Sequence, residues 1–284
     1  MSTLLAQPLQ GGQSDDDPFF YGWRYVLKKD TDGKEKRVQV PLTQKEVLHP
    51  QEDDFIMQNE AHEEDCHYLK TVLAAHLAGQ PGTVIYRDQR IDWGIAEIEP
   101  HGPDLAVLAD VPHDRNPQQG TLHLSMSGAH PLLVIEVTSP STRDVDLDEK
   151  VVEYDRVGVP FYAIVDRRIR NDCEELRLLA YRTTREGYVR VKLDAQGWLA
   201  LEPIGLSLGI EGRNLVCRDA RGERLLDYQE VVQAFRDATS RAQAAEARAQ
   251  AAEARAQTET QARQAAEERI RELEVEMSRL RGQS

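Results

Sequence analysis

The chain has 284 residues, of which 40% are apolar, and a formal net charge of −14 at pH 7. This length and composition allow at least one sizeable core, and no segment approaches the roughly twenty consecutive apolar residues of a membrane span. Strong negative charge also argues against nucleic-acid binding over the whole surface, because such binding gains its affinity by neutralising phosphates.

The compartment is indicated by what the sequence lacks. The N-terminal segment has neither the basic nor the long apolar region of a secretory signal. The three cysteines, Cys66, Cys173 and Cys217, are widely spaced, which favours free thiols over a disulfide framework or a zinc site. We therefore expect a cytoplasmic protein without membrane contact.

The negative charge is unevenly distributed. From Arg241 onward the chain has eight arginines and eight glutamates, so the whole excess belongs to residues 1–240. A DNA-binding surface on this part must therefore be a local patch, unless bound cations offset the acidic groups.

The N-terminal third contains a polar start, a hairpin and a helix. Residues 1–18 are polar and are expected to be disordered. Asp30-Thr-Asp-Gly33 separates two strand-like segments and indicates a hairpin over residues 21–41. Asn59 is a suitable N-cap for a helix that continues to about residue 78.

The segment after Gly79 predicts a mixed sheet. Apolar runs of strand length occur at residues 83–87, 104–110, 132–138, 161–166, 176–181, 188–193, 206–210 and 215–218. A helix is expected over residues 144–157, where Asp146 and Glu149 have the spacing of an N-cap and its N3 partner. We expect residues 19–226 to form one α/β domain with helices flanking a mixed central sheet.

From residue 227 the character of the chain changes. No glycine or proline occurs between Asp227 and Leu280, and apolar residues repeat with heptad spacing. One core position contains Phe235, Ala242, Ala249, Ala256, Arg263, Ile270 and Met277, and the other contains Val231, Ala238, Ala245, Ala252, Glu259, Ala266, Leu273 and Leu280.

We therefore expect a coiled-coil helix over residues 227–284. At roughly fifty residues it would be about 75 Å long, and it would pair with a second copy or with a partner protein. The end that contains Ile270 and Leu273 has the strongest seam. The alternative is an alanine-rich single helix, maintained by helix propensity and Glu/Arg pairs.

Glu136 is the most unusual residue of the predicted sheet. It lies within the apolar strand of residues 131–138, and a buried charge there requires an ion pair, hydrogen bonds or a metal. Asp104 opens another apolar strand about thirty residues earlier. Two carboxylates from neighbouring strands would suit a divalent metal held against a phosphodiester. Alternatively, Glu136 pairs with Arg143 or Arg87, and Asp104 caps a turn.

The segment around Glu136 carries a recognisable motif. Residues 136–150 read EVTSPSTRDVDLDEK, and they continue through Tyr154 to the segment GVPFYAIVD at 158–166. With Gly102-Pro-Asp104, this pattern resembles the Uma-two family of restriction endonucleases, a branch of the PD-(D/E)xK nuclease superfamily. The resemblance covers roughly residues 40–210. It implies a restriction-endonuclease-like fold, a mixed central sheet flanked by helices.

The resemblance also implies a site. Asp104 and Glu136 would hold Mg²⁺ or Mn²⁺, and a lysine would assist hydrolysis of DNA phosphodiester bonds. The superfamily places this lysine two residues after the glutamate, where this chain has Thr138. Lys150 matches the family's lysine on the following helix, which predicts Lys150 as the third catalytic residue. Alternatively, Lys150 pairs with Asp146 or Glu153 on an exposed side of the helix.

Three further groups are weaker candidates. A third acid from the first helix would be Glu63, Glu64 or Asp65, although their N-terminal position also suits the helix dipole. His67 lies where the family tends to have a histidine. Arg167, Arg168 and Arg170 form a basic cluster that would meet phosphates or lie in a solvated loop.

Two other functions stay open at this point. In the first, the domain is a catalytically inactive nuclease fold that binds nucleic acid or protein, with the C-terminal helix as its interface. In the second, the protein is an acidic structural adaptor that never contacts DNA. Salt-dependent binding separates the adaptor from the other two, because phosphate contacts weaken as ionic strength rises.

Overall fold

The computed structural model describes residues 17–170 and 173–281. The expected disorder of residues 1–18 therefore falls almost entirely outside the described residues. The chain divides into two compact units at Asp227 and Tyr228. Among the described residues, no helix combines the length and the apolar content needed to cross a bilayer.

The first unit contains short helices and thirteen described strands. The helices are α1 (Gln44–Leu48), α2 (Glu60–Leu77), α3 (Leu124–Ser127), α4 (Arg143–Leu147), α5 (Glu149–Arg156) and the 3-10 turn η1 (Glu202–Ile204). The first eight strands are β1 (Trp23–Lys29), β2 (Glu35–Pro41), β3 (Val84–Arg87), β4 (Arg90–Asp92), β5 (Leu105–Ala109), β6 (Thr121–His123), β7 (His130–Val137) and β8 (Phe161–Arg170). The remaining strands are β9 (Cys173–Thr184), β10 (Gly187–Arg190), β11 (Leu199–Leu201), β12 (Leu206–Glu211) and β13 (Asn214–Arg218).

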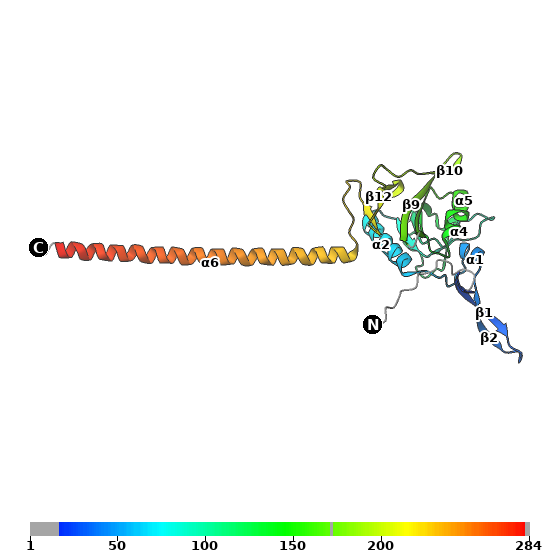
Figure 1. The fold of residues 1–284 in the computed structure, drawn as a ribbon, viewed down its shortest axis with the longest axis horizontal. Coiled ribbons are helices and arrows are strands. Elements are labelled where there is room, and N and C mark those ends of the chain that lie inside the picture. The colour runs from blue at the N-terminus through cyan, green and yellow to red at the C-terminus, as the bar shows by residue number, and fades with distance from the viewer. Residues whose placement is uncertain (1–16, 171–172, 282–284) are drawn as a thin grey trace, which may run out of the picture. The chain divides into compact units, whose positions relative to one another are not determined.

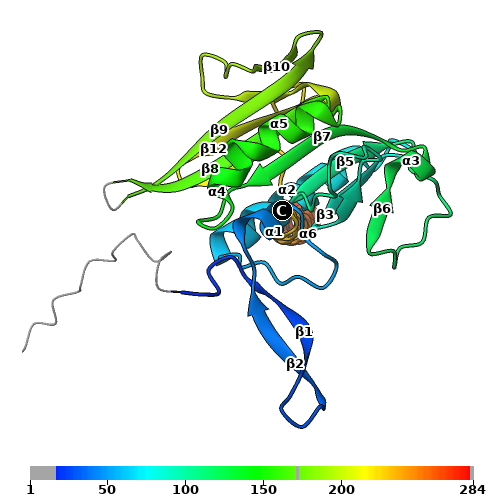
Figure 2. The ribbon, with the colours of Figure 1, turned by 90° about the vertical axis from the view of Figure 1, so that its right-hand side faces the viewer.

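Six strands form the central sheet, in the order β10-β9-β8-β7-β5-β3 (Figure 2). Only β7 and β8 are parallel, and every other neighbouring pair is antiparallel. Helices α4 and α5 form the connection between the parallel strands, as a crossover requires. The predicted mixed α/β fold with flanking helices is confirmed.

The two faces of this sheet bury separate cores. Leu133, Ile135 and Val137 of β7 point into a core shared with α2 and the small sheet β11-β12-β13. Val134 points into the other core, together with Tyr154 of α5. Because side chains alternate along a strand, Glu136 shares the face of Val134 and therefore lies beneath α5.

Strand register brings the two predicted acids together. Leu105 of β5 is paired with Ile135 of β7, so Asp104 stands at the end of β5 beside Glu136. The two positions are 32 residues apart in sequence and adjacent across the sheet. Sheet pairing alone therefore produces the convergence of Asp104 and Glu136.

The predicted helix at 144–157 is divided into two. Thr142 is the N-cap of α4, and α5 begins at Glu149 after a break at Asp148, where φ is −119° and ψ is −72°. The expectation that Asp146 caps the helix was wrong, because its buried carboxylate pairs instead with Lys150 one turn later. Strands β4 and β6 form a small parallel pair that the sequence pattern did not indicate.

The second unit is the helix α6 (Tyr228–Arg281), which is 54 residues long. Figure 1 shows it as one uninterrupted helix. Its charged side chains pair along the helix, as in Arg263 Nε to Glu267 Oε1 at 3.0 Å. The predicted long C-terminal helix is confirmed.

Candidate functional site

Asp104 and Glu136 are locked to one another across the strand pair β5–β7. The backbone N–H of Asp104 donates to Glu136 Oε2 at 3.1 Å, and the N–H of Val137 donates to Asp104 Oδ2 at 2.8 Å. Each carboxylate thus accepts a hydrogen bond from the strand that carries the other. These two hydrogen bonds orient both side chains and involve neither Glu136 Oε1 nor Asp104 Oδ1.

Lys150 reaches this pair from α5. Its Nζ lies 2.9 Å from Glu136 Oε1 and 2.8 Å from Asp146 Oδ1, and the residue is only 4% exposed. The Tyr154 hydroxyl donates to the same Glu136 oxygen at 2.7 Å. Lys150 therefore faces the sheet, and its pairing with Asp146 accompanies its contact with Glu136.

The alternative arginine partners of Glu136 are engaged elsewhere. Arg143 Nε donates to Asp166 Oδ1 at 2.8 Å, and Arg87 pairs with Glu63. Lys150 is therefore the basic partner of Glu136 among the residues that the structure describes.

His62 completes the cluster from the first turn of α2. Its Nε2 lies 3.1 Å from Asp104 Oδ2, and its own backbone N–H is capped by the Asn59 side chain at 2.9 Å. The sequence interpretation set His62 aside, because the histidines of this helix lack metal-ligand spacing on one face. Its spacing of seven residues from the buried Leu69 places it on the same helix face, and this signal would have identified it.

The candidates named on α2 lie away from the acidic pair. Glu63 binds Arg87, and Asp65 Oδ2 lies 2.8 Å from Arg167 Nη2. Glu64 and His67 are exposed. None of these four has a described contact with Asp104 or Glu136.

The predicted basic cluster lies within β8 and not in a loop after the strand, and acidic partners largely neutralise its described side chains. Arg167 pairs with Asp65, and Arg168 Nη2 lies 2.8 Å from Glu175 Oε2. The side chain of Arg170 lies outside the described residues. Paired arginines are less available to phosphates, so Arg167 and Arg168 are weak candidates for phosphate contacts.

Burial and mutual charge set the protonation of the cluster. Burial raises the pKa of Glu136 well above its usual value, against the opposing effect of Lys150. Burial also raises the pKa of Asp146. For Asp104, burial is outweighed by the hydrogen bond and charge of His62 and by Lys150, so the pKa falls. Asp104 is therefore the most strongly acidic carboxyl group of the cluster.

The two basic residues of the cluster, Lys150 and His62, both have raised pKa values. Burial would lower the pKa of Lys150, but Asp146, Glu136 and Asp104 outweigh it and raise the pKa. Burial of His62 is likewise outweighed by Asp104, which raises the imidazole pKa. Lys150 is thus held as an ammonium group.

A cavity of about 370 Å³ opens onto these groups. It is lined by Asp104, Glu136 and Lys150, together with Glu52 and Asp88 and with residues of the 47–58 segment. Asp104 uses Oδ2 for its contacts, so Oδ1 has no hydrogen-bond partner within the described ranges. This oxygen is available to a ligand in the cavity.

The donor set fits a hard divalent cation. The carboxylates of Glu136 and Asp146 contact Lys150, the carboxylate of Asp104 lies on the neighbouring strand, and buried negative charge is costly unless it is compensated. Asp146 Oδ2 is buried without a partner of hydrogen-bond geometry in the described part of the chain. Carboxylate oxygens are the ligands that Mg²⁺ and Mn²⁺ prefer.

Among the described residues, two clusters of three side chains have all their ligand atoms within 4.8 Å of each other, and the three carboxylates of Asp104, Glu136 and Asp146 are spread more widely than that. The first contains His62, Cys66 and Asp104, and burial raises the pKa of the Cys66 thiol, so a metal there would have to displace a tightly held proton. The second contains His49, His101 and Glu153.

The second cluster is explained by hydrogen bonding. Trp93 Nε1–H donates to His101 Nδ1 at 2.8 Å, which requires the ring proton on Nε2. That proton is donated to Glu153 Oε2 at 2.7 Å. Burial lowers the pKa of His101 to about 4, so the neutral tautomer persists and Nε2 has no free lone pair for a metal.

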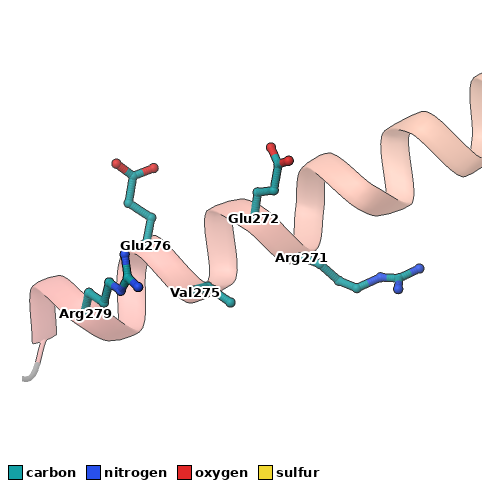
Figure 3. Close-up of a pocket in the computed structure, with 5 residues that line it drawn as sticks. All are labelled: Arg271, Glu272, Val275, Glu276 and Arg279. Atoms are coloured by element: carbon teal, nitrogen blue, oxygen red, sulfur yellow. The ribbon is translucent and has the colours of Figure 1, made fainter.

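A shallow hollow on α6 lacks the features of a site. It is lined by Arg271, Glu272, Val275, Glu276 and Arg279, whose side chains extend from a single helix (Figure 3). No second described element closes it, and its charged groups are of the kind found on any solvated helix.

Interlocked acids at the ends of two adjacent strands, joined by a lysine from the crossover helix, define a sheet domain with an acidic polar centre beside a cavity. A comparison with models of protein families identifies the family to which such a domain belongs. The model of the Uma2 family, described as "Putative restriction endonuclease", matches residues 52–215, more than half of the chain. The chain belongs to this family, which confirms the resemblance inferred from its motifs.

A comparison with solved structures gives a distant match. The structure is described as "a putative nuclease belonging to DUF820 from Anabaena variabilis ATCC 29413". It is 13% identical, and the match covers 61% of this chain and 77% of that chain with a TM-score of 0.35. No curated protein matches this chain.

Proposed function

We propose that this protein is a metal-dependent endonuclease that hydrolyses DNA phosphodiester bonds. The observation that carries the proposal is the meeting of Asp104, Glu136 and Lys150 at one wall of a cavity. Membership of a family whose description is "Putative restriction endonuclease" supports the reaction class. Nucleic acid is the substrate that this class implies.

Asp104 and Glu136 are the proposed ligands of Mg²⁺ or Mn²⁺. Asp104 has the lowered pKa and an uncommitted oxygen, so it is a ready anionic ligand. Ionisation of Glu136 is opposed by burial and favoured by a nearby cation, so metal binding and loss of its proton are coupled. The bound cation would neutralise charge on the phosphate and lower the pKa of a water molecule.

Lys150 is the proposed replacement for the lysine that is absent at position 138. The Thr138 hydroxyl accepts a hydrogen bond from the Arg167 N–H at 2.9 Å, so that position has a structural role. Lys150 approaches Glu136 from the helix instead, 2.9 Å from its carboxylate. Its permanent charge suits stabilisation of the negative charge that develops on a phosphate oxygen during hydrolysis.

His62 and Tyr154 are proposed as positioning residues. His62 holds Asp104 Oδ2, which leaves Oδ1 directed to other partners. Tyr154 holds Glu136 Oε1, and because burial raises its phenol pKa well above the usual value, it stays a hydrogen-bond donor. Each acid is therefore oriented by a neighbour on a helix.

A cleavage assay on plasmid and linear DNA with Mg²⁺ or Mn²⁺ tests this proposal. We expect Asp104→Asn and Lys150→Met each to reduce the cleavage rate by at least about 100-fold, the scale for loss of an electrostatic catalytic group. Asp110→Asn is the matched control, because Asp110 is exposed at the other end of β5 and asparagine tolerates its positive φ of 54°. Full activity in both site variants would refute the assigned site.

One observation favours an inactive module as the second candidate. Glu136 already receives Lys150, Tyr154 and the Asp104 N–H, so the network can compensate its own charge. In that case the wild-type protein would bind DNA in a salt-dependent manner and cleave none under any metal. Binding measured alongside cleavage separates the two functions.

We also propose that α6 mediates homodimer formation. Phe235 and Ile270 are 72% and 56% exposed, and both occupy one heptad core position. A dimer would supply two active sites, which suits cleavage of both strands of a duplex.

Light scattering of the full chain tests this association. Substitution of Ile270 and Leu273 by lysine is expected to halve the mass, because both lie at heptad core positions. Lysine at the exposed Gln257 and Gln264 is the matched control. An unchanged mass in the core variant would exclude pairing through this end of α6.

A further inference from the structure

The hairpin β1–β2 is the part of the first unit least explained by the proposed function. It lies before the matched family segment of residues 52–215 and forms a two-stranded sheet of its own. Its two strands have seven residues each, so the ribbon extends roughly 20 Å. Figure 2 shows it running away from the central sheet. An isolated two-stranded ribbon gains little stability by itself, so its persistence calls for an explanation.

The root of the hairpin is fixed to the wall of the cavity. Trp23 and Phe55 exchange two backbone hydrogen bonds, each 2.9 Å long, and their rings stack with centroids 5.6 Å apart. Arg24 Nε lies 2.8 Å from Asp54 Oδ1. Both Asp54 and Phe55 line the cavity that contains Asp104 and Glu136. A ligand held along the hairpin would therefore run toward the acidic cluster.

The outer half of the hairpin has an excess of free positive charge. Its exposed basic residues are Lys28, Lys29, Lys34, Lys36 and Arg37, against Asp30, Asp32 and Glu35. Within the described ranges, none of the four lysines forms an ion pair. Elsewhere in the domain Arg143 and Arg167 are paired with acids, and exposed cations such as Lys70 and Arg185 are separate in sequence and not grouped along one ribbon.

Cross-strand pairing makes this charge unfavourable for the free protein. Lys28 lies directly opposite Lys36 in the register of the two strands, and like charges in that position repel. Arg37 lies over the ring of Tyr25, 4.4 Å from its centroid, so its guanidinium is held on the ribbon surface. Lys29 lies opposite Glu35, so the uncompensated charge centres on Lys28, Lys36 and Arg37. An excess of cations held in this way on one ribbon indicates a surface that binds an external polyanion.

We infer that β1–β2 is a phosphate-binding ribbon that lies against duplex DNA and directs a phosphodiester into the cavity. The inference rests on the proposed function for the identity of the polyanion. The major groove of DNA is about 12 Å wide and admits a two-stranded ribbon, with lysines at its edges reaching the flanking phosphates. A local basic ribbon would also allow a chain with a net charge of −14 to bind DNA.

Binding of a fluorescent DNA duplex in metal-free buffer tests this inference, because cleavage is not required. The full chain is compared with the triple variant Lys28→Ala, Lys34→Ala and Lys36→Ala over about 50 to 200 mM salt. We expect the slope of log affinity against log salt to fall by roughly two to three, since three phosphate contacts are lost. Replacing the same three lysines by arginine should preserve the slope and shows that the ribbon still folds.

Three exposed cations elsewhere provide the matched control, and Lys70→Ala, Arg185→Ala and Arg190→Ala should leave the slope near its wild-type value. Equal losses in the hairpin and control variants would overturn the inference, as would an absence of duplex binding by the wild type. Equal affinity for a single strand of the same length would overturn the groove-binding geometry. Duplex binding that depends on the hairpin, in a protein that cleaves nothing, would support the ribbon and refute the endonuclease.

Discussion

The cluster around Glu136 and the helix α6 use the same types of charged residue under opposite conditions. In the cluster, Lys150 is 4% exposed and lies within 3 Å of two carboxylates from separate elements. On α6, Arg263 pairs with Glu267 on the same helix, and both side chains face solvent. A buried charge requires defined partners to offset its desolvation, whereas removal of the partner of an exposed charge costs the protein little stability. The effect of a charge mutation should therefore follow its burial.

The largest expected effect is that of Lys150→Met. Removal of the ammonium leaves Glu136 and Asp146 buried without compensation, which is expected to lower the free energy of unfolding by about 3–5 kcal/mol. Urea denaturation measures this change. Lys45→Met is the control, because Lys45 is exposed and its pair with Glu99 is long, at 3.6 Å. Similar stability of the two variants would contradict the comparison.

Tyr154→Phe should have the next largest effect. The substitution keeps the ring packing against Trp93 and Tyr162 and removes only the hydroxyl that donates to Glu136. A loss of about 1–3 kcal/mol is expected, because a buried acceptor loses one of its donors. Tyr228→Phe, at an exposed position of α6, should leave the stability unchanged under the same denaturation conditions.

Asp166 provides a test that depends on pH. Burial opposes its ionisation, but hydrogen bonds and charge from Arg143 and Arg177 outweigh this and lower its pKa. A lowered native pKa means that its contribution to stability is complete above about pH 4 and is lost as the pH falls through the native pKa. Asp166→Asn should reduce stability at pH 7 and flatten the stability profile in acid. Asp114→Asn, at an exposed site, should retain the wild-type profile measured by thermal unfolding.

The smallest effect is expected for Arg263→Ala on α6. Loss of one exposed pair between residues four apart costs about 0.2–0.5 kcal/mol, and alanine's helix propensity offsets part of it. Circular dichroism should show an unchanged helix content. Because Arg263 also occupies a heptad core position, a marked change in helix content would show that it contacts the second helix of the proposed dimer.

Sequence patterns predicted those structural features that depend on residues close together in the chain. Alternation along residues 131–138 placed Glu136 on the sheet face opposite Ile135, and the structure has that arrangement. Heptad spacing without glycine or proline predicted α6. The hairpin followed from a turn sequence ending in Gly33 between two strand-like segments. These features depend on residues that are close in the chain.

Partners from separate elements were harder to identify. Asp146 is fully buried, and its carboxylate and that of Glu136 both contact Lys150, which faces the sheet after a helix break at Asp148. The sequence interpretation assigned Asp146 to a helix cap because capping is its commonest role at that spacing. The role of His62 was not recognised because its partner Asp104 is 42 residues away in the sequence.

The sequence by itself determined the strand with its single glutamate, the acid that opens a second strand, the family motif and the long terminal helix. Only the tertiary structure decided which groups meet: Lys150 on Glu136, His62 on Asp104, and the hairpin root on Phe55. The physical reason is that periodicity and turn chemistry act over a few residues, whereas a buried charge selects its partners from every element that the fold brings within hydrogen-bond distance.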